Sequence, residues 1–259
     1  MKSLQVTSLL ATTVILLAAA FGTGCGGDSS TAKPTLTVSA ASSLKTPFTA
    51  YGREFTSADT RFSFAGSDEL AAQIRQGVKP DVFAAANTKL PAALFAEGLV
   101  EKPVAFAGSR LVVAVPAGSG KVNTFDDLQK DGIRLAIGSK SVPIGAYTRK
   151  LLDQLPQDQA DAILANVRSE EPNVHLIAGK VAQGGADAGF VYVTDVSAAG
   201  GRLRAVELPA ELKSTVAYGV AVVKGAKQPE QAQKFIDGLL DGQGQQALAD
   251  AGFEPPPSK

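Results

Sequence analysis

The sequence predicts an α/β fold with mixed, mainly parallel sheets. Short apolar runs rich in valine and alanine alternate with helical patterns, and small or acidic residues stand where several helices are expected to begin. The chain has 259 residues, 45% of them hydrophobic, which is enough for one large domain or two modest ones with cores of their own.

The expected strands and helices alternate along the whole chain after residue 34. The expected strands are residues 35–41, 61–66, 80–87, 109–119, 134–139, 188–196 and 217–225. The expected helices are residues 43–57, 67–77, 88–100, 146–155 and 179–185, with two more in 229–252.

Local signals justify the less obvious of these elements. Pro47 is compatible with the first helix because a first turn tolerates proline. Asp68 and Glu69 suit the first turn of the second helix, whose partial positive charge favours acids, and Gly77 suits its end. Pro116 marks where the strand 109–119 leaves one lobe for another.

Composition and charge exclude several kinds of function. A formal net charge of zero and no basic block argue against a nucleic-acid surface. A single cysteine and a single histidine, far apart, form no Cys/His zinc cluster. A nucleophile–histidine arrangement would have to use His175, and no nucleophile-elbow motif accompanies it.

The N-terminus reads as an export signal. Residues 9–21 form an apolar run of signal-peptide length, and a small residue precedes Cys25, as in bacterial lipoprotein signals. We expect residues 1–24 to be a lipoprotein signal peptide, Cys25 to be lipidated and residues 25–33 to be a flexible tether. The protein would then be exported and held at the outer face of the cell membrane, or periplasmic. The alternative is an ordinary secretory signal with an incidental cysteine.

Three strand-to-helix corners are candidate anion sites. Ser43 and Ser67 each follow a strand and open a helix, and a further helix start lies around Ile144 and Gly145. Ligands of open α/β sheets bind beyond the carboxyl ends of strands, where helix N-termini present unpaired N–H groups. A serine at a helix start is, by itself, more often only an N-cap, so these corners alone do not establish a site.

Five motifs stand between residues 36 and 253: TVSAASSL, FAGSDELAAQIRQGVKPDVFAAAN, SRLVVAVP, LAIGSKSVPIGAYTRKLL and AGFVYVTDV. Together they resemble the periplasmic molybdate-binding proteins, the receptors of ABC importers. The resemblance implies a two-lobed, type II periplasmic binding protein fold with two crossover strands at the hinge. Lobe one is expected to comprise residues 34–113 and 220–259, and lobe two residues 114–219.

The resemblance also implies a ligand set for molybdate made of hydroxyl and backbone N–H donors. The matching positions in this chain are Ser43, Ser67, Ile144, Val174 and Tyr192. Ser42 stands where the family usually has alanine, and Ile144 stands in a VPIG turn where the family has VPAG. The larger isoleucine side chain is expected to reshape the pocket wall, although its N–H is unaffected.

The chemistry of the ion agrees with such a donor set. Molybdate is a tetrahedral dianion without a proton at neutral pH, so it only accepts hydrogen bonds, and hydroxyl and N–H groups can donate them. The resemblance further implies a membrane permease as partner, a monomer, no cofactor other than the oxyanion and no enzymatic activity.

Alternatives stay open at this point. The same fold could bind tungstate, which is nearly the same size as molybdate, or sulfate, which is smaller. A ferric-iron receptor is poorly supported by four tyrosines and one histidine. An enzyme on this fold would need a base or nucleophile in the cleft, which the matched positions do not supply.

Overall fold

The computed structural model describes residues 33–212 and 215–257, which form an α/β fold. The predicted signal peptide, Cys25 and all of the tether except Lys33 lie outside the described residues. In the part of the chain that is described, no helix has the length and apolar character that a membrane span requires.

The described strands form one nine-stranded sheet. Its order is β2-β1-β3-β9-β4-β7-β5-β6, and β8 pairs with β4 beside this path. The strands are β1 (Thr35–Ala41), β2 (Asp59–Ala65), β3 (Val82–Ala85), β4 (Val104–Pro116), β5 (Leu135–Gly138), β6 (Val167–Glu171), β7 (Ala188–Tyr192), β8 (Leu203–Val206) and β9 (Thr215–Val222).

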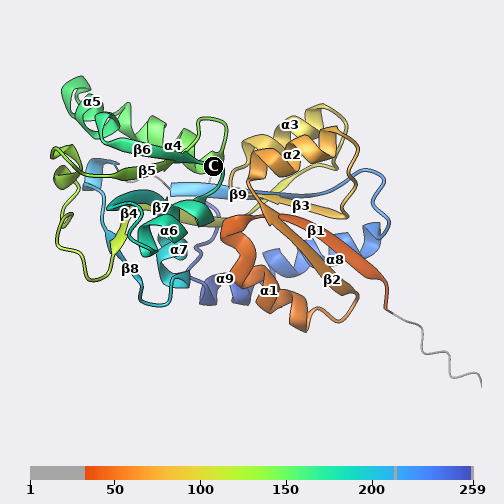
Figure 1. Ribbon diagram of the computed structural model, residues 1–259. Helices are drawn as coiled ribbons and strands as arrows, with labels where there is room; N and C mark the ends of the chain where they lie inside the picture. Colours follow the sequence, from red (N-terminus) through yellow and green to blue (C-terminus); the bar gives the residue numbers. More distant parts are fainter. Residues whose placement is uncertain (1–32, 213–214, 258–259) are drawn as a thin grey trace, which may run out of the picture. The chain divides into compact units, whose positions relative to one another are not determined.

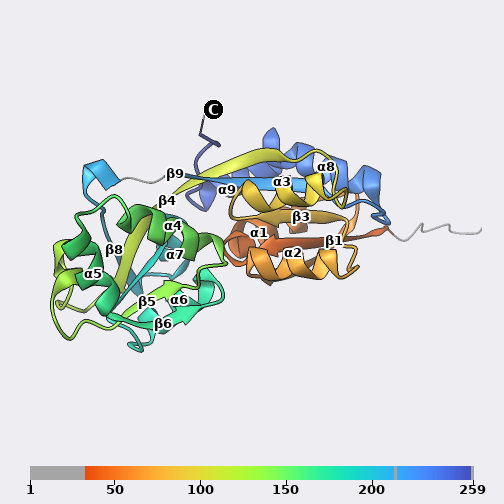
Figure 2. The same cartoon turned by 90° about the horizontal axis from the view of Figure 1, so that it is seen from above.

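Strand β4 belongs to two parts of this sheet. Its residues 104–110 pair with β9, and its residues 111–116 pair with β7 and β8. We call β2, β1, β3, β9 and residues 104–110 the first sheet part, and β5, β6, β7, β8 and residues 111–116 the second. Figures 1 and 2 show β4 and β9 running between the two parts. The lobe boundaries expected at 113/114 and 219/220 stay a prediction.

The sheet is mixed, but it is not mainly parallel. Of the eight strand pairs in the described residues, β1–β2, β1–β3, β5–β6 and β5–β7 are parallel, and β3–β9, β4–β7, β4–β8 and β4–β9 are antiparallel. The expectation that parallel strand pairs would outnumber antiparallel ones was wrong, because β4 and β9, which connect the sheet parts, each run antiparallel to their neighbours.

Helices cover both faces of the first sheet part. Figure 1 shows α2 and α3 on one face and α1, α8 and α9 on the other. The α-helices are α1 (Lys45–Glu54), α2 (Ser67–Arg75), α3 (Lys89–Ala96), α4 (Pro143–Leu152), α5 (Gln157–Ala165), α6 (Val174–Ala182), α7 (Val193–Ala198), α8 (Pro229–Leu240) and α9 (Gln243–Asp250). Residues 33–212 and 215–257 also contain the short 3-10 helices η1 (Ser42–Leu44), η2 (Asp126–Gln129) and η3 (Ala210–Leu212).

Aromatic rings pack α1 against α8 on one face of the first sheet part. The Phe48 and Phe235 rings meet edge to face at 5.6 Å, and Tyr51 and Phe235 lie 4.6 Å apart between ring centroids. The Tyr51 hydroxyl donates to the Phe235 carbonyl at 3.3 Å. All three side chains are buried, and each contributes about 1.5–3 kcal/mol or more through the apolar surface it removes from water.

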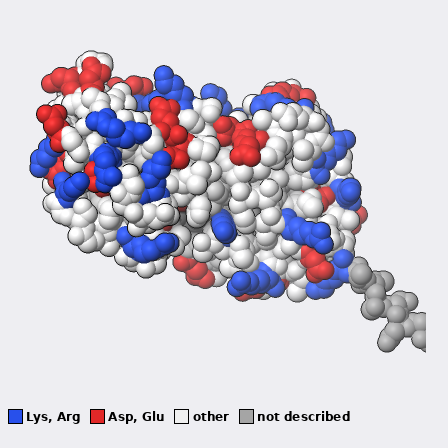
Figure 3. Space-filling model, viewed as in Figure 1, with Lys and Arg blue, Asp and Glu red and all other residues white. Residues whose placement is uncertain are grey.

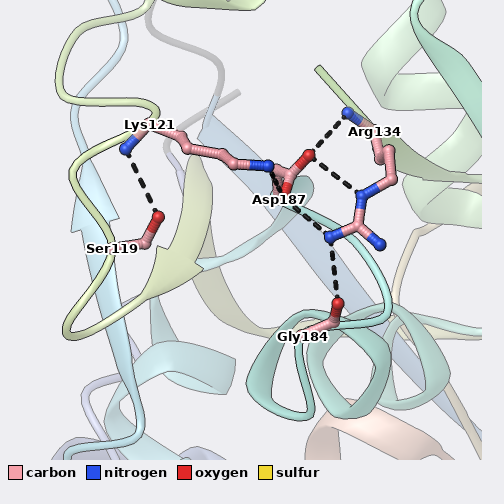
Figure 4. A network of polar contacts seen from close by, with 5 residues as sticks. All are labelled: Ser119, Lys121, Arg134, Gly184 and Asp187. Atoms are coloured by element: carbon pink, nitrogen blue, oxygen red, sulfur yellow. Dashed lines mark hydrogen bonds and ion pairs between the residues drawn. The ribbon is translucent and has the colours of Figure 1, made fainter. Parts of the chain in front are cut away.

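The second sheet part is tied together by a charged cluster at the start of β7. Asp187 accepts hydrogen bonds from the Arg134 backbone N–H at 3.0 Å and from its guanidinium at 2.8 and 3.1 Å, and Lys121 approaches it at 3.1 Å. Figure 4 shows this cluster, which we call the Asp187 brace. Because Arg134 directly precedes β5 and Asp187 directly precedes β7, the brace aligns these two parallel strands.

Several elements depart from the sequence-based expectations. The strand expected over 188–196 ends at Tyr192, because Asp195 accepts a hydrogen bond from the Tyr192 N–H at 3.1 Å and α7 begins at Val193. The helix expected at 179–185 begins earlier, at Val174. Strands β6 and β8 and helix α5 were not expected from the sequence.

The C-terminal tail joins β4. Gly108 and Glu254 exchange two backbone hydrogen bonds, at 2.6 and 3.0 Å. A Cβ at position 108 would lie 2.6 Å from the carbonyl oxygen of Pro255, so this close approach requires glycine. Phe253 packs its ring edge to face on Tyr218 of β9 at 5.2 Å.

Candidate functional site

A small cavity lies between the two sheet parts, and its lining includes all five residues predicted from the sequence. Its volume is about 20 Å³, which is room for one small, compact group. The first sheet part and its helices contribute Ala41, Ser42, Ser43, Ala65, Gly66, Ser67 and Ala86. The second contributes Val142, Pro143, Ile144, Asn173, Val174 and Tyr192.

On the first side, two serine hydroxyls line the cavity, and each receives a hydrogen bond from another group of the protein. Ser43 lies in η1 directly after β1, and its Oγ accepts from the Tyr218 hydroxyl at 3.2 Å. Ser67 is the first residue of α2, and its Oγ accepts from the Ala86 N–H at 3.0 Å. Since each hydroxyl accepts this bond rather than donating it, its own proton is available to the cavity.

On the second side, two helices begin at the cavity. Pro143 and Val174 are the first residues of α4 and α6, and the first four N–H positions of a helix have no partner within it. The N–H groups of Ile144 and Val174 are therefore available as donors, and the helix dipoles favour an anion there.

Two sequence features fix these helix starts. A Cβ at Gly145 would lie 1.9 Å from the Ser139 carbonyl oxygen, so only glycine lets α4 begin this close to the end of β5. Asn173 is the N-cap of α6, and its side chain accepts from the Leu176 N–H at 3.1 Å. That cap satisfies the third N–H of the helix and leaves the Val174 N–H unused.

Tyr192 completes the second side from the end of β7. Its side chain is fully buried, and its hydroxyl has no hydrogen-bond partner among the described residues. Burial raises the pKa of Tyr192 well above its ordinary value, so the hydroxyl keeps its proton and can donate. A buried polar hydrogen without an acceptor is costly, and a ligand in the cavity that accepts hydrogen bonds would remove that cost.

Among the described residues, no charged side chain lines the cavity. Asp68 and His175 directly follow the lining residues Ser67 and Val174 in the sequence. Asp195 lies three residues after Tyr192, and burial raises its pKa to about 7. Asp195 faces a second, larger cavity of about 350 Å³ that Lys45, His175 and Arg202 also line. On the face that Figure 3 shows, acidic and basic groups are interspersed rather than gathered by sign.

Two contacts join the two sides beside the cavity. Ser141 donates to Asp68 at 2.9 Å, between the loop before α4 and the first turn of α2. A Cβ at Gly66 would lie 2.6 Å from the Pro172 carbonyl oxygen, so these two loops touch. The arrangement therefore encloses the cavity with donors from both sides.

Sequence reasoning missed some of the residues that shape this site. Ser42 was noted only as a departure from the family pattern, yet it lines the cavity. The role of Asn173 was readable from an asparagine directly before an apolar helical pattern, which is a common N-cap signal. The bond from Tyr218 to Ser43 had no such signal, because the two residues lie far apart in the sequence.

The family model described as "Bacterial extracellular solute-binding protein" matches residues 36–254. The molybdate-binding protein ModA of Mycobacterium tuberculosis is 34% identical over 246 residues, covering 90% of this chain and 92% of the relative. A putative ABC transporter substrate-binding lipoprotein of Bacillus subtilis, YvgL, is 27% identical over 95% of this chain and 96% of its own length.

Solved structures of binding proteins share the fold. The periplasmic molybdate-binding protein of Azotobacter vinelandii superposes with a TM-score of 0.76 at 22% identity, over 86% of this chain and 100% of that one. The substrate-binding domain of a putative molybdenum ABC transporter from Clostridium difficile has a TM-score of 0.65 at 28% identity, over 86% and 99%. The sulfate-binding protein SubI of Mycobacterium tuberculosis has a TM-score of 0.76 at 20% identity, over 86% and 87%.

Proposed function

The chain belongs to the family of bacterial extracellular solute-binding proteins, and we propose that it captures molybdate for an ABC importer. The proposed ligands are the hydroxyls of Ser43, Ser67 and Tyr192 and the backbone N–H groups of Ile144 and Val174. Tungstate has the same charge and shape and is proposed as a second ligand of the same site.

The observation that carries this proposal is the fully buried hydroxyl of Tyr192, which has no hydrogen-bond partner in the described part of the chain and lies in a cavity lined by donors. A proton-free tetrahedral dianion accepts hydrogen bonds through all four oxygens, so it matches such a lining. Each bond to a charged partner is worth about 1.5–3 kcal/mol before the cost of removing water from the ion.

The size of the cavity also supports a small inorganic ion. About 20 Å³ is far below the several hundred Å³ that pockets for larger organic ligands occupy. The named molybdate-binding relatives point in the same direction.

Because hydrogen-bond donors come from both sides of the cavity, the ligand should stabilise the arrangement in which the two sides face each other. Neither side alone offers the full donor set, so the anion binds best when Ser43 and Ser67 face Ile144, Val174 and Tyr192 across the cavity. We propose that a membrane permease recognises this liganded form. A lipid on Cys25 would keep the protein near that permease, and mass spectrometry of the mature N-terminus tests this anchor.

The other candidate functions have less support from the site. Sulfate has the same charge and shape as molybdate, and cavity size has to separate the two. Among residues 33–212 and 215–257, no three His, Cys, Asp or Glu side chains gather as a metal site, so the ferric-iron alternative gains no ligand set there. As far as the structure describes the chain, the cavity lining has no carboxylate, histidine or lysine to act as an enzyme's base.

Calorimetric titration of the purified protein with molybdate, tungstate, sulfate and phosphate tests the proposal. We expect tight binding of molybdate and tungstate and weaker binding of the other two. At a molybdate concentration of about 100 times its dissociation constant, the free energy of unfolding should rise by about 2.7 kcal/mol. No heat of binding and no thermal shift with molybdate would overturn the proposed function.

A further inference from the structure

We propose that Tyr218 is a positioning residue that holds the Ser43 hydroxyl as a donor toward the anion. The inference rests on the proposed function, because it assigns a role to the partner of one proposed ligand. Tyr218 lies on β9, outside the cavity lining, and acts only through Ser43.

The position of the Tyr218 ring is fixed by its surroundings. The side chain is fully buried, and three aromatic rings meet it at steep angles: Tyr192 at 5.7 Å, Phe253 at 5.2 Å and Phe106 at 6.3 Å between centroids. Its strand is held on both sides, by β3 and β4. The hydroxyl therefore has little freedom to seek another partner than the Ser43 Oγ at 3.2 Å.

Counting protons determines the direction of this hydrogen bond. Burial raises the pKa of Tyr218 well above its ordinary value, so its hydroxyl carries a proton that needs an acceptor. If Ser43 donated to Tyr218 instead, the tyrosine proton would lose its acceptor in a buried place, at the cost of an unsatisfied polar group. Tyr218 therefore donates, and the Ser43 proton is left for the cavity.

Ser67 provides an internal comparison. Its Oγ accepts from the Ala86 N–H at 3.0 Å, and an amide N–H cannot reverse its role. Both serine hydroxyls thus accept a hydrogen bond from the protein and keep their protons for the cavity, Ser67 through a backbone group and Ser43 through Tyr218. Only the bond from Tyr218 can be removed by a side-chain substitution.

The direction of this bond has a consequence for affinity. An oxyanion that only accepts hydrogen bonds gains most when the hydroxyls of the site present their protons to it, and the bond from Tyr218 leaves the Ser43 proton for that purpose. In Tyr218→Phe the Ser43 hydroxyl loses this partner and is free to rotate, so it donates less reliably to molybdate.

The test is a calorimetric comparison of the wild-type protein, Tyr218→Phe and Tyr51→Phe with molybdate. We expect Tyr218→Phe to weaken molybdate binding roughly tenfold. Tyr51→Phe removes another buried hydroxyl, whose partner is the Phe235 carbonyl, and should leave the molybdate affinity unchanged. An unchanged affinity in Tyr218→Phe, or an equal loss in Tyr51→Phe, would overturn the inference.

A double-mutant cycle with Ser43→Ala separates a role through Ser43 from any other role of Tyr218. If Tyr218 acts only through Ser43, adding Tyr218→Phe to Ser43→Ala changes the molybdate affinity no further. Additive losses in the double variant would overturn the inference while the proposed function stands. A wild-type protein that binds no molybdate would overturn both. The phenylalanine ring keeps the packing of Tyr218, and a thermal melt of each variant verifies its folding.

Discussion

Strand β7 has a cluster of polar groups at each end, and the two clusters are built on opposite principles. At its start, the Asp187 brace combines a carboxylate with Arg134 and Lys121, and each charge has a partner in the protein. At its end, the buried Tyr192 hydroxyl lies in a cavity without charged side chains and has no partner among the described residues. The first cluster is complete without a ligand, whereas the second lacks an acceptor. Substitutions at the two ends should therefore affect different properties.

The largest expected effect lies at the ligand end of β7. Tyr192→Phe should weaken molybdate binding about 10- to 100-fold, because one hydrogen bond to a dianion is worth about 1.5–3 kcal/mol. The ligand-free protein should be as stable as the wild type or slightly more so, since the substitution removes a buried hydroxyl that has no acceptor. Titration calorimetry and a thermal melt without ligand measure the two effects. An unchanged molybdate affinity would show that Tyr192 is not a ligand.

At the other end of β7, a matched substitution should act on stability alone. Asp187→Asn leaves Arg134 and Lys121 without their anion and should lower the free energy of unfolding by about 1–2 kcal/mol. The figure is modest because both basic side chains are half-exposed. Urea denaturation measures it, and the molybdate affinity of the folded variant should equal that of the wild type. A weakened affinity would mean that the two ends of the strand are coupled.

The brace also predicts an acid-dependent loss of stability. Its hydrogen bonds to Arg134 hold the pKa of Asp187 well below the usual range. A depressed pKa gives stability that is present above the unfolded-state pKa of about 3.9 and is lost as the pH falls toward the folded-state value. Below about pH 4 the difference in stability between wild type and Asp187→Asn should therefore shrink. Denaturation curves at a series of pH values test this, and a constant difference would contradict it.

The smallest expected effect concerns Asp195, which lies close to the ligand end. Burial raises its pKa to about 7, so it gains its negative charge as the pH rises through neutrality. That charge opposes a dianion, while Lys45, His175 and Arg202 around the adjoining cavity moderate its effect. Molybdate affinity should fall by roughly two- to fivefold between pH 6 and pH 8. Asp195→Asn should flatten this dependence, and an identical slope in that variant would exclude Asp195 as its cause.

Local sequence patterns predicted part of the ligand end of β7 and the fold class. The corners at Ser43, Ser67 and Ile144 were predictable from strand-to-helix patterns and the rule for open sheets. Val174 and Tyr192 were expected only from the resemblance to the molybdate-binding proteins, and they line the same cavity. Their roles as ligands remain predictions. The alternation of strands and helices likewise predicted the α/β fold.

Contacts between distant parts of the chain were not predictable in this way. The pairing of Arg134 with Asp187, like that of Tyr218 with Ser43, depends on strand order, and the sequence pattern carries no signal for it. The antiparallel course of β4 and β9 was missed for the same reason. The early start of α6 was a different kind of error, since Asn173 before an apolar pattern was a local signal that went unused.

The two hydrogen bonds between Gly108 and Glu254 have a consequence for biogenesis. The first sheet part takes β1, β2 and β3 from the beginning of the described chain and β9 and the tail from its end. A nascent chain cannot complete this half of the molecule until residues 215–254 have left the ribosome, because long-range pairing has to wait for the distant partner. For a polypeptide that is translocated before it folds, this late completion would delay premature folding on the wrong side of the membrane.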